Sequence, residues 1–391
     1  MKSRIKLFIV TCVVFLTTMS ANAFSFRNIT LDFVHITDTH ICQNDNTSYK
    51  ALASSQALLE DAINQINAIK GLDFVLFTGD MVNSGTAYNY DLFYSALNKL
   101  KYPSLNAFGN HDFYGSESKD EVVKIVSSYN PNYTFSGTYW AISPKTDYRI
   151  IVLDSTIPND KTANGELSRE QLAFLDSELS QNQDKIVVIA MHHPSVEPFV
   201  AKEHALYNAN EFNEILIKYK NPIVVLSGHY HAAKIRRIGN IVFVSTPAMV
   251  TYPMGFRHIK IVNFKDRVEY KFDFISTSLD EVKEQNRQNV ISYSALAGLE
   301  SDRTLEYTYY KRKHKSVSYK RNKIKNAAKD VKTSKRELKK LEKEISKPAQ
   351  SEKVKKERKL FKKKEPKVKK ERKGLFSKKN KNESQDEATV Q

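Results

Sequence analysis

The chain has 391 residues, of which 41% are hydrophobic and 27% charged, enough apolar residues for a folded domain with a sizeable core. Its net charge of +17 is unevenly placed: residues 301–391 carry 33 Lys and Arg against 13 Asp and Glu, whereas residues 1–300 carry 28 and 31. The basic charge therefore belongs to the C-terminal segment and excludes no function for the rest. Cys12 and Cys42 are the only cysteines, so a disulfide framework is excluded as the basis of the fold.

The first 23 residues have the pattern of an export signal. Residues 1–6 carry three basic side chains, residues 7–16 form an apolar run, and Ala21-Asn22-Ala23 offers a small-residue cleavage site. The apolar run is too short to span a bilayer, which takes about 20 residues. The segment 1–23 is therefore predicted to be a signal peptide that directs export to the periplasm or the medium. An uncleaved membrane anchor remains the alternative.

Residues 24–300 alternate between apolar runs and helical periodicity. The helical spacing lies at 49–70, 90–100 and 119–128, and Ser168-Arg169-Glu170-Gln171 reads as a capping box that starts another helix. Strands are expected at 31–36, 74–77, 150–153, 186–190 and 223–226, followed by hairpins at 235–244 and 258–276. This order predicts an α/β domain at 24–300, with a mixed sheet or two sheets packed face to face and helices outside.

Residues 301–391 form a Lys-rich, low-complexity tail. A basic heptapeptide beginning at Lys353 recurs at Lys367, and one charged helix is conceivable at 325–347. Because the tail has too few apolar residues to offset the entropy of ordering, we expect it to be largely disordered. Its charge suits an anionic membrane or cell-wall surface, whereas export argues against nucleic acid as a partner. A solvated tail with no fixed partner is the alternative.

Side chains of metal-ligand type follow five of the apolar runs. They are Asp38 and His40, Asp80, Asn110 with His111 and Asp112, His192 with His193, and His229 with His231. Since ligands gather at the carboxyl ends of parallel strands, we expect these side chains to lie close together. Carboxylate and amide oxygens with imidazole nitrogens suit two divalent or trivalent cations, and Asp80 could bridge them with one metal on each oxygen.

Each cluster alone has a structural explanation, such as a capping aspartate or a hydrogen-bonded histidine. His35, inside the first strand, is expected to be a core or surface histidine, and Cys42 a small buried apolar residue. The combination of five clusters in one domain is what predicts a two-metal site.

The five motifs resemble, in order, the signature of the calcineurin-like metallophosphoesterase superfamily. They are Asp38-x-His40, Gly79-Asp80, Gly109-Asn110-His111-Asp112, His192-His193-Pro194 and Gly228-His229-x-His231. The resemblance implies a four-layer α/β/β/α sandwich with two mixed sheets. It also implies two metal ions (Mn, Fe or Zn). One would be held by Asp38, His40 and His231, the other by Asn110, His192 and His229, with Asp80 as the bridge.

The resemblance implies hydrolysis of a phosphodiester or a phosphomonoester by attack of a metal-bound hydroxide. His111, positioned by Asp112 or another neighbour, would protonate the leaving oxygen or steady the phosphate, and His193 would only shape the site. Purple acid phosphatases lack a histidine equivalent to His40 and carry a tyrosine at the position of Asn83, so no tyrosinate iron site is expected. The motif spacing is closer to the bacterial branch that contains cyclic-nucleotide phosphodiesterases.

Two questions stay open at the level of sequence. Tyr114, His204, Tyr230 and Tyr252 could line a substrate pocket, but packing or a place on the surface explains each of them better. The alternative function is a non-catalytic envelope-binding protein with a structural metal site and a basic anchoring tail. The complete set of ligands, together with His111, favours the enzyme.

Overall fold

The computed structural model describes residues 28–43, 48–116, 118–129, 137–157, 162–201 and 203–311. The expected signal peptide at 1–23, the tail from residue 312 onward and the helix expected at 325–347 lie outside these ranges. Within them, no helix combines the length and the apolar character that a bilayer crossing requires.

The first of two six-stranded sheets has the order β12-β11-β10-β1-β2-β3. Its strands are β1 (Ile29–Ile36), β2 (Phe74–Thr78), β3 (Ser104–Ala107), β10 (Gly255–Asn263), β11 (Arg267–Ser276) and β12 (Leu305–Tyr310). Strands β1, β2 and β3 run parallel, whereas β10 pairs antiparallel with β1 and continues into the β10–β11–β12 meander. The sheet is therefore mixed, as the late hairpins in the sequence predict.

The second sheet has the order β4-β5-β6-β7-β9-β8. Its strands are β4 (Trp140–Ile142), β5 (Tyr148–Val152), β6 (Ile186–Ala190), β7 (Ile223–Ser227), β8 (Lys234–Ile238) and β9 (Ile241–Ser245). The four central strands, β5, β6, β7 and β9, are parallel, and the edge strands β4 and β8 are antiparallel. Continuous apolar runs form the central strands because both faces of this sheet are covered.

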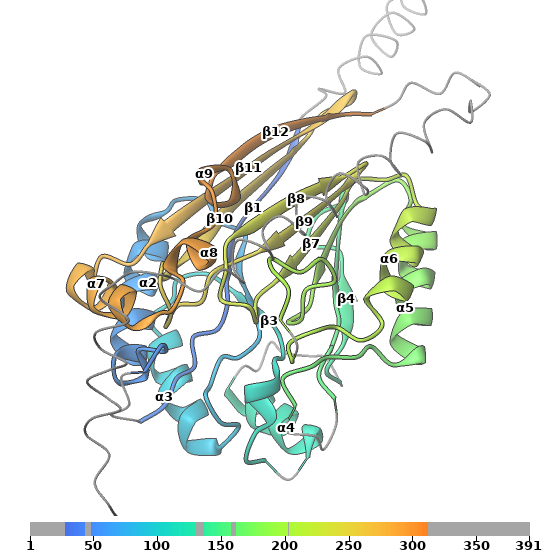
Figure 1. Cartoon of the computed structure of the whole chain (residues 1–391). Helices are drawn as coiled ribbons and strands as arrows, with labels where there is room; N and C mark the ends of the chain where they lie inside the picture. The colour runs from blue at the N-terminus through green and yellow to red at the C-terminus, as the bar shows by residue number, and fades with distance from the viewer. Residues whose placement is uncertain are drawn as a thin grey trace, which may run out of the picture. The chain divides into compact units, whose positions relative to one another are not determined.

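Side chains along each central strand point alternately to the two faces of the sheet, and together they form three separate hydrophobic cores. In β1, Leu31 and Phe33 point into the core between the two sheets, whereas Val34 and Ile36 point to the helices outside. The outer helices of the first sheet are α2 (Ser55–Ala68), α3 (Ala87–Leu97) and α4 (Lys119–Tyr129), and those of the second are α5 (Arg169–Gln181) and α6 (Ala209–Lys218). The four layers (Figure 1) confirm the predicted sandwich.

Short elements complete the domain. They are the 3-10 turns η1 (Leu52–Ser54) and η2 (Asn110–Phe113) and the helices α7 (Asp280–Asn289), α8 (Tyr293–Ala297) and α9 (Glu300–Arg303). The capping box predicted at α5 is present in part: the Ser168 hydroxyl accepts a hydrogen bond from the Gln171 N–H at 3.2 Å. This bond satisfies one of the free N–H groups at the start of the helix.

The folded unit continues past residue 300, where the sequence placed the domain boundary. Strand β12 pairs with β11 along its whole length, and the fully buried Arg257 side chain ties α9 to the sheets. Its guanidinium donates hydrogen bonds to the carbonyl oxygens of Asp302 at 2.6 Å, Arg303 at 2.5 Å and Ser245 at 3.1 Å. The boundary at 300 is therefore too early, because residues 301–311 belong to the fold.

We predict that Arg257→Met lowers the free energy of unfolding by about 3 kcal/mol, because it leaves several buried carbonyl groups without a donor. Urea denaturation of the purified protein measures this change. Arg169→Met, on the exposed start of α5, is the matched control and should change stability by no more than about 0.5 kcal/mol. Equal stability of the two variants would contradict the structural role of Arg257.

Candidate active site

The structure brings the predicted ligands together at the carboxyl ends of the parallel strands. Each ligand follows the strand before it: β1, β2, β3, β6 or β7. All are buried, none exposing more than 7% of its surface: Asp38, His40, Asp80, Asn110, His192, His229 and His231. Parallel strands from both sheets therefore end around one site.

The backbone at this site is strained. Among the described residues, six non-glycine residues have positive φ, and five of them are predicted ligands: Asp38, His40, Asp80, His229 and His231. Such a conformation costs about 1–3 kcal/mol per residue and persists only where the surrounding structure enforces it. Its concentration at the ligands marks the strand ends as a functional site.

Two glycines of the motifs are required by close approach. A Cβ atom at Gly109 would overlap Asp80 Oδ1, and one at Gly228 would overlap Thr37 Oγ1 and Asp38 Oδ2. Both glycines thus let neighbouring backbone pass directly behind a ligand carboxylate.

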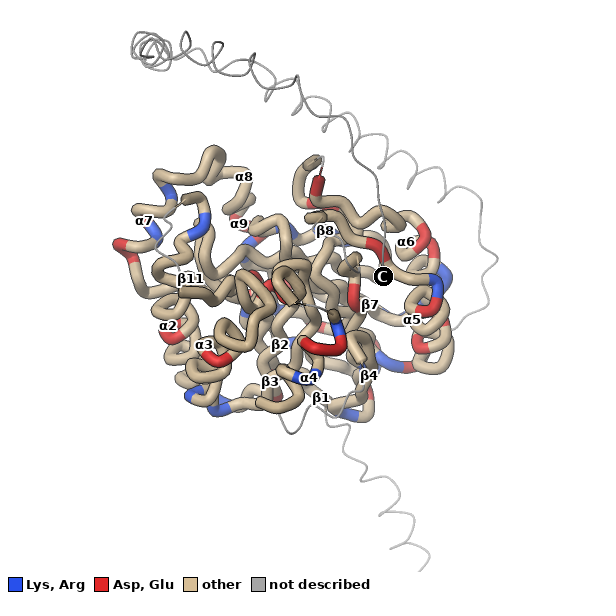
Figure 2. The backbone as a smooth tube through the Cα atoms, turned by 90° about the horizontal axis from the view of Figure 1, so that it is seen from below, with Lys and Arg blue, Asp and Glu red and all other residues tan. Residues whose placement is uncertain are grey.

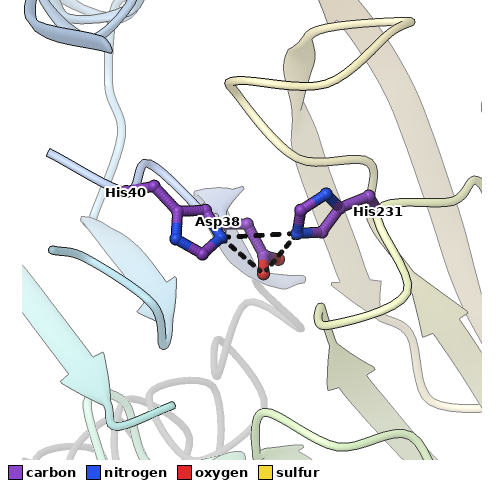
Figure 3. A group of neighbouring side chains, drawn as sticks. All are labelled: Asp38, His40 and His231. Carbon is purple, nitrogen blue, oxygen red and sulfur yellow. Dashed lines mark hydrogen bonds and ion pairs between the residues drawn. The ribbon is translucent and has the colours of Figure 1, made fainter. Parts of the chain in front are cut away.

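The first ligand group consists of Asp38, His40 and His231 (Figure 3). Asp38 Oδ1 lies 3.3 Å from His231 Nε2 and 3.8 Å from His40 Nε2, and the two Nε2 atoms are 3.4 Å apart. The other oxygen, Asp38 Oδ2, accepts hydrogen bonds from the Thr37 hydroxyl and the His229 N–H. Asp38 Oδ1 has no hydrogen-bond donor among the described residues, so it is free to bind a cation.

The second ligand group consists of Asp80, His192 and His229. His192 Nε2 lies 3.3 Å from Asp80 Oδ2 and 3.1 Å from His229 Nδ1. Asn110 contributes an amide oxygen: its Nδ2 donates to the Tyr114 hydroxyl at 2.9 Å, and its Oδ1 is buried with no partner in the described part of the chain. Tyr114 therefore orients the amide instead of lining the pocket.

Asp80 is shared by the two groups through a single oxygen. Asp80 Oδ2 lies 3.5 Å from His40 Nε2 and 3.3 Å from His192 Nε2, whereas Oδ1 accepts the His111 N–H at 2.8 Å. The expectation of one metal on each oxygen stays a prediction. The turn η2 aims a backbone N–H at Oδ1, so Oδ2 is the oxygen that faces both groups.

The remaining hydrogen bonds fix which imidazole nitrogen is free. His192 Nδ1 lies 2.8 Å from the Thr78 carbonyl oxygen, which can only accept, so Nδ1 carries a proton and Nε2 is the nitrogen that faces Asp80. His231 Nδ1 contacts the Thr251 hydroxyl at 2.9 Å. Outer contacts of this kind orient metal-binding histidines. Imidazole nitrogens, carboxylate and amide oxygens and unpartnered buried atoms together fit a centre of two cations without thiolate.

Electrostatics within the site also fits cation binding. Burial alone would raise the pKa of Asp80, but His192 and His111 hold it well below its usual value. Burial lowers the pKa of His192, yet Asp80 outweighs this effect and raises it to about 9. Burial holds the pKa values of His40 and His229 well below normal. These two rings are therefore neutral, the form in which imidazole binds metals.

His111 is held by Asn83 and not by Asp112. His111 Nδ1 donates to the Asn83 carbonyl oxygen at 2.9 Å, which turns Nε2 toward the pocket. The Asp112 carboxylate instead accepts the N–H groups of Gly109 at 2.8 Å and Val82 at 3.2 Å. Burial and the nearby Asp80 raise the pKa of Asp112 to about 8. Of the two alternatives for positioning His111, the structure therefore supports another neighbour, Asn83. Asp112 instead stabilises the turn through its hydrogen bonds to Gly109 and Val82.

Lys50 is a site residue that the sequence did not reveal. Its ammonium lies 3.3 Å from His111 Nε2 and 3.5 Å from His40 Nδ1, and its side chain is only 8% exposed. It comes from the loop between β1 and η1, where no motif or periodicity points to the site. The only indication in the sequence was a basic residue shortly after the Asp38-x-His40 motif.

The other residues singled out in the sequence fall into two groups. Tyr230 and His204 line the pocket at the ligands, whereas Tyr252 packs against Tyr293, with ring centroids 6.1 Å apart. His35 is a buried core histidine between the hydroxyls of Thr78 and Thr246, and Cys42 is buried. His193 contacts the Ser155 hydroxyl and packs its ring against His229, in a shaping position.

Comparison with known proteins agrees with this geometry. Residues 31–233, more than half of the chain, match the family model of the calcineurin-like phosphoesterases. The chain therefore belongs to the calcineurin-like phosphoesterase family. By class it is a metal-dependent hydrolase of phosphoric esters.

Similar proteins carry related descriptions. A protein from Arcobacter nitrofigilis described as a probable glycerophosphodiester phosphodiesterase is 29% identical over 228 residues, covering 57% of this chain and 79% of its own. A 3',5'-cyclic-nucleotide phosphodiesterase from Nostoc sp. is 25% identical over 225 residues, with coverage of 57% and 79%. The crystal structure of a dimetal phosphatase from Danio rerio superimposes with a TM-score of 0.52 at 17% identity, covering 63% of this chain and 99% of that one, which supports the fold.

We predict that Asp80→Asn lowers the metal content at both positions, because one oxygen of Asp80 faces both ligand groups. His40→Ala should mainly empty one position. Elemental analysis of the purified, manganese-loaded proteins measures both. His258→Gln, which alters a histidine paired with Asp32 outside the site, is the control. Unaltered metal stoichiometry in Asp80→Asn would contradict the shared role of Asp80.

Proposed function

We propose that this protein hydrolyses a phosphodiester or a phosphomonoester at a dinuclear metal centre. The observation that carries the proposal is the sharing of Asp80 Oδ2 between two groups of nitrogen and oxygen ligands, directly beside the ring of His111. Two such groups around one carboxylate are the arrangement that holds a pair of metal ions for phosphoryl chemistry.

An open pocket lies over the ligands. Asp80, Asn110, His111, His229 and His231 form its floor. Its wall comes from Tyr49, Phe199, His204, Tyr230 and Leu296, among others. The cavity proper measures about 170 Å³ and opens to solvent at its mouth. It can hold the phosphate of an ester at the ligands, with an organic substituent toward the aromatic wall and the mouth.

The side chains divide the work of hydrolysis. Metal ions in such a centre act as Lewis acids that draw charge from the phosphoryl oxygens and make water a better nucleophile at neutral pH. Asp80 and Asp38 would supply the negative charge that holds the cations, and Asn110 Oδ1 would complete one position. Hydrolysis adds water across a P–O bond, so the leaving oxygen must gain a proton. His111 Nε2 points into the pocket, where its protonated form donates to the leaving or phosphoryl oxygen.

The descriptions of the relatives support the diester class, since both bacterial relatives named above are described as phosphodiesterases. The proposal therefore covers both ester classes and is tested with both. Full-length protein loaded with manganese should turn over a chromogenic diester, a chromogenic monoester or both. Two bound metals without turnover of either class would overturn the proposal in favour of a non-catalytic binding protein.

We predict that His111→Ala lowers kcat by about 100- to 10,000-fold while metal content stays unchanged, because His111 contributes proton transfer and not a ligand to the centre. Its backbone N–H, which binds Asp80 Oδ1, remains in the variant. Steady-state kinetics and elemental analysis on the same preparation separate the two effects. Full activity in His111→Ala would contradict its role, and His258→Gln again controls for the loss of a histidine elsewhere.

We also propose that the protein is exported and that its basic tail binds an anionic membrane or cell-wall surface. The support is the signal-like segment 1–23 and the excess of 20 positive charges in residues 301–391. In the described part, acidic and basic residues lie side by side on α4, where Lys119 and Lys124 flank Asp120 and Glu121 (Figure 2). Residues 1–300 as a whole carry 28 basic and 31 acidic residues.

We predict that the full chain binds vesicles containing anionic lipid, and that salt and deletion of residues 312–391 each weaken the binding. The deletion leaves β12 intact. Co-sedimentation with anionic and with neutral vesicles measures the effect, and cell fractionation tests export. Equal binding by the full and truncated chains would rule out the tail as the contact.

A further inference from the structure

Lys50 places a buried ammonium group at the catalytic pocket. Its Nζ lies 3.3 Å from His111 Nε2, and both side chains line the pocket with Asp80 and Asn110. The two ligand groups consist of carboxylates, an amide and imidazoles, and nothing in that set accounts for an additional cation.

Lys50 differs from three partly buried lysines of the described chain that each have a carboxylate partner. Lys119 pairs with Asp154 at 2.6 Å, Lys145 with Asp73 at 2.6 Å and Lys234 with Asp302 at 3.1 Å. Among the described residues, no carboxylate oxygen lies within 4.0 Å of Lys50 Nζ, so Lys50 forms no ion pair with them. The imidazole nitrogens of His40 and His111 beside Lys50 bring no negative charge, and a buried ammonium without a close counterion is costly. Its position in the pocket makes a bound anion the counterion.

The neighbouring His111 fixes where this anion would bind. The Asn83 carbonyl holds His111 Nδ1, so Nε2 and Lys50 Nζ face each other. The ammonium of Lys50 has three N–H donors, and its contacts with His40 and His111 use at most two of them. The remaining donor can therefore bind an oxygen of the substrate phosphate beside His111 in the pocket.

We propose that Lys50 is a phosphate-binding residue that favours a dianionic phosphomonoester over a monoanionic phosphodiester. The inference rests on the proposed function, since it concerns the substrate of the same site. At a given distance, a cation attracts a dianion twice as strongly as a monoanion. A monoester keeps a third charged or charge-sharing oxygen on phosphorus, which in a diester is replaced by a second ester oxygen. Lys50 therefore adds more to monoester binding and turnover than to diester turnover.

The test compares Lys50→Met and Lys50→Arg in the full-length, manganese-loaded protein. Methionine keeps most of the length without the charge, and arginine keeps the charge. The substrates are p-nitrophenyl phosphate and bis(p-nitrophenyl) phosphate. We expect Lys50→Met to lower kcat/KM for the monoester about 100-fold and for the diester about 10-fold or less, while Lys50→Arg restores most of the monoester activity. Lys70→Met, on the exposed surface, should change neither value.

Inorganic phosphate serves as a probe that does not depend on turnover. Its dissociation constant, measured by calorimetry on the manganese-loaded protein, should rise about tenfold in Lys50→Met. Elemental analysis should show unchanged metal content, because Lys50 is not a ligand. Loss of metal in Lys50→Met would overturn the proposal and assign the residue to the support of His40.

The other outcomes are equally decisive. Equal losses for the two substrates, or unchanged phosphate binding, would overturn the assignment of Lys50. If the wild-type protein hydrolyses neither substrate, the proposed function fails. The phosphate dissociation constants of wild type and Lys50→Met then still decide whether Lys50 binds phosphate.

Discussion

The site depends on the enforced proximity of two buried carboxylates, Asp38 and Asp80. Neither group is solvated, and both sit among imidazole rings at distances of 3.3–4.0 Å. In a medium of low dielectric constant, like charges so placed destabilise the fold unless cations compensate them. The left-handed backbone at both residues adds a further cost. The rest of the domain must therefore be rigid enough to hold this arrangement.

The sandwich supplies that rigidity because its central strands are buried on both faces. Leu31 and Phe33 fix β1 to the opposite sheet, while Val34 and Ile36 fix it to the helices, so the strand cannot shift by one residue without reversing every contact. The ligands follow such strands after very short connections. Gly109 then permits the backbone of the β3 connection to pass directly behind Asp80. Strain at the ligands is thus offset by packing in the three cores.

Much of this was predictable from sequence, for identifiable physical reasons. Strands covered on both faces appear as continuous apolar runs, and ligands at strand ends retain a recognisable order, so the layers and the ligand set followed from the pattern. Strand β12 was missed because Leu305, Tyr307 and Tyr309 directly precede the charged tail. Lys50 was missed because it lies in the loop between β1 and η1, whose sequence has no periodicity that would predict its position at the site. Which oxygen of Asp80 faces both ligand groups depends on the direction of the His111 N–H, and residue spacing in the sequence does not reveal that direction.

The pocket is built from residues inside the part that matches the family and from residues outside it. The ligands lie within residues 31–233, the part that matches the family, but Thr251 and Leu296 of the pocket lie beyond it. The carbonyl of Leu296 accepts the Ala233 N–H at 2.7 Å, and Arg257 of β10 binds the carbonyl groups of the following α9. The later segment is therefore fixed against the ligand loop of β7. Changes in this segment and at Lys50 can alter which ester fits while leaving the ligands in place, which separates substrate choice from the reaction itself.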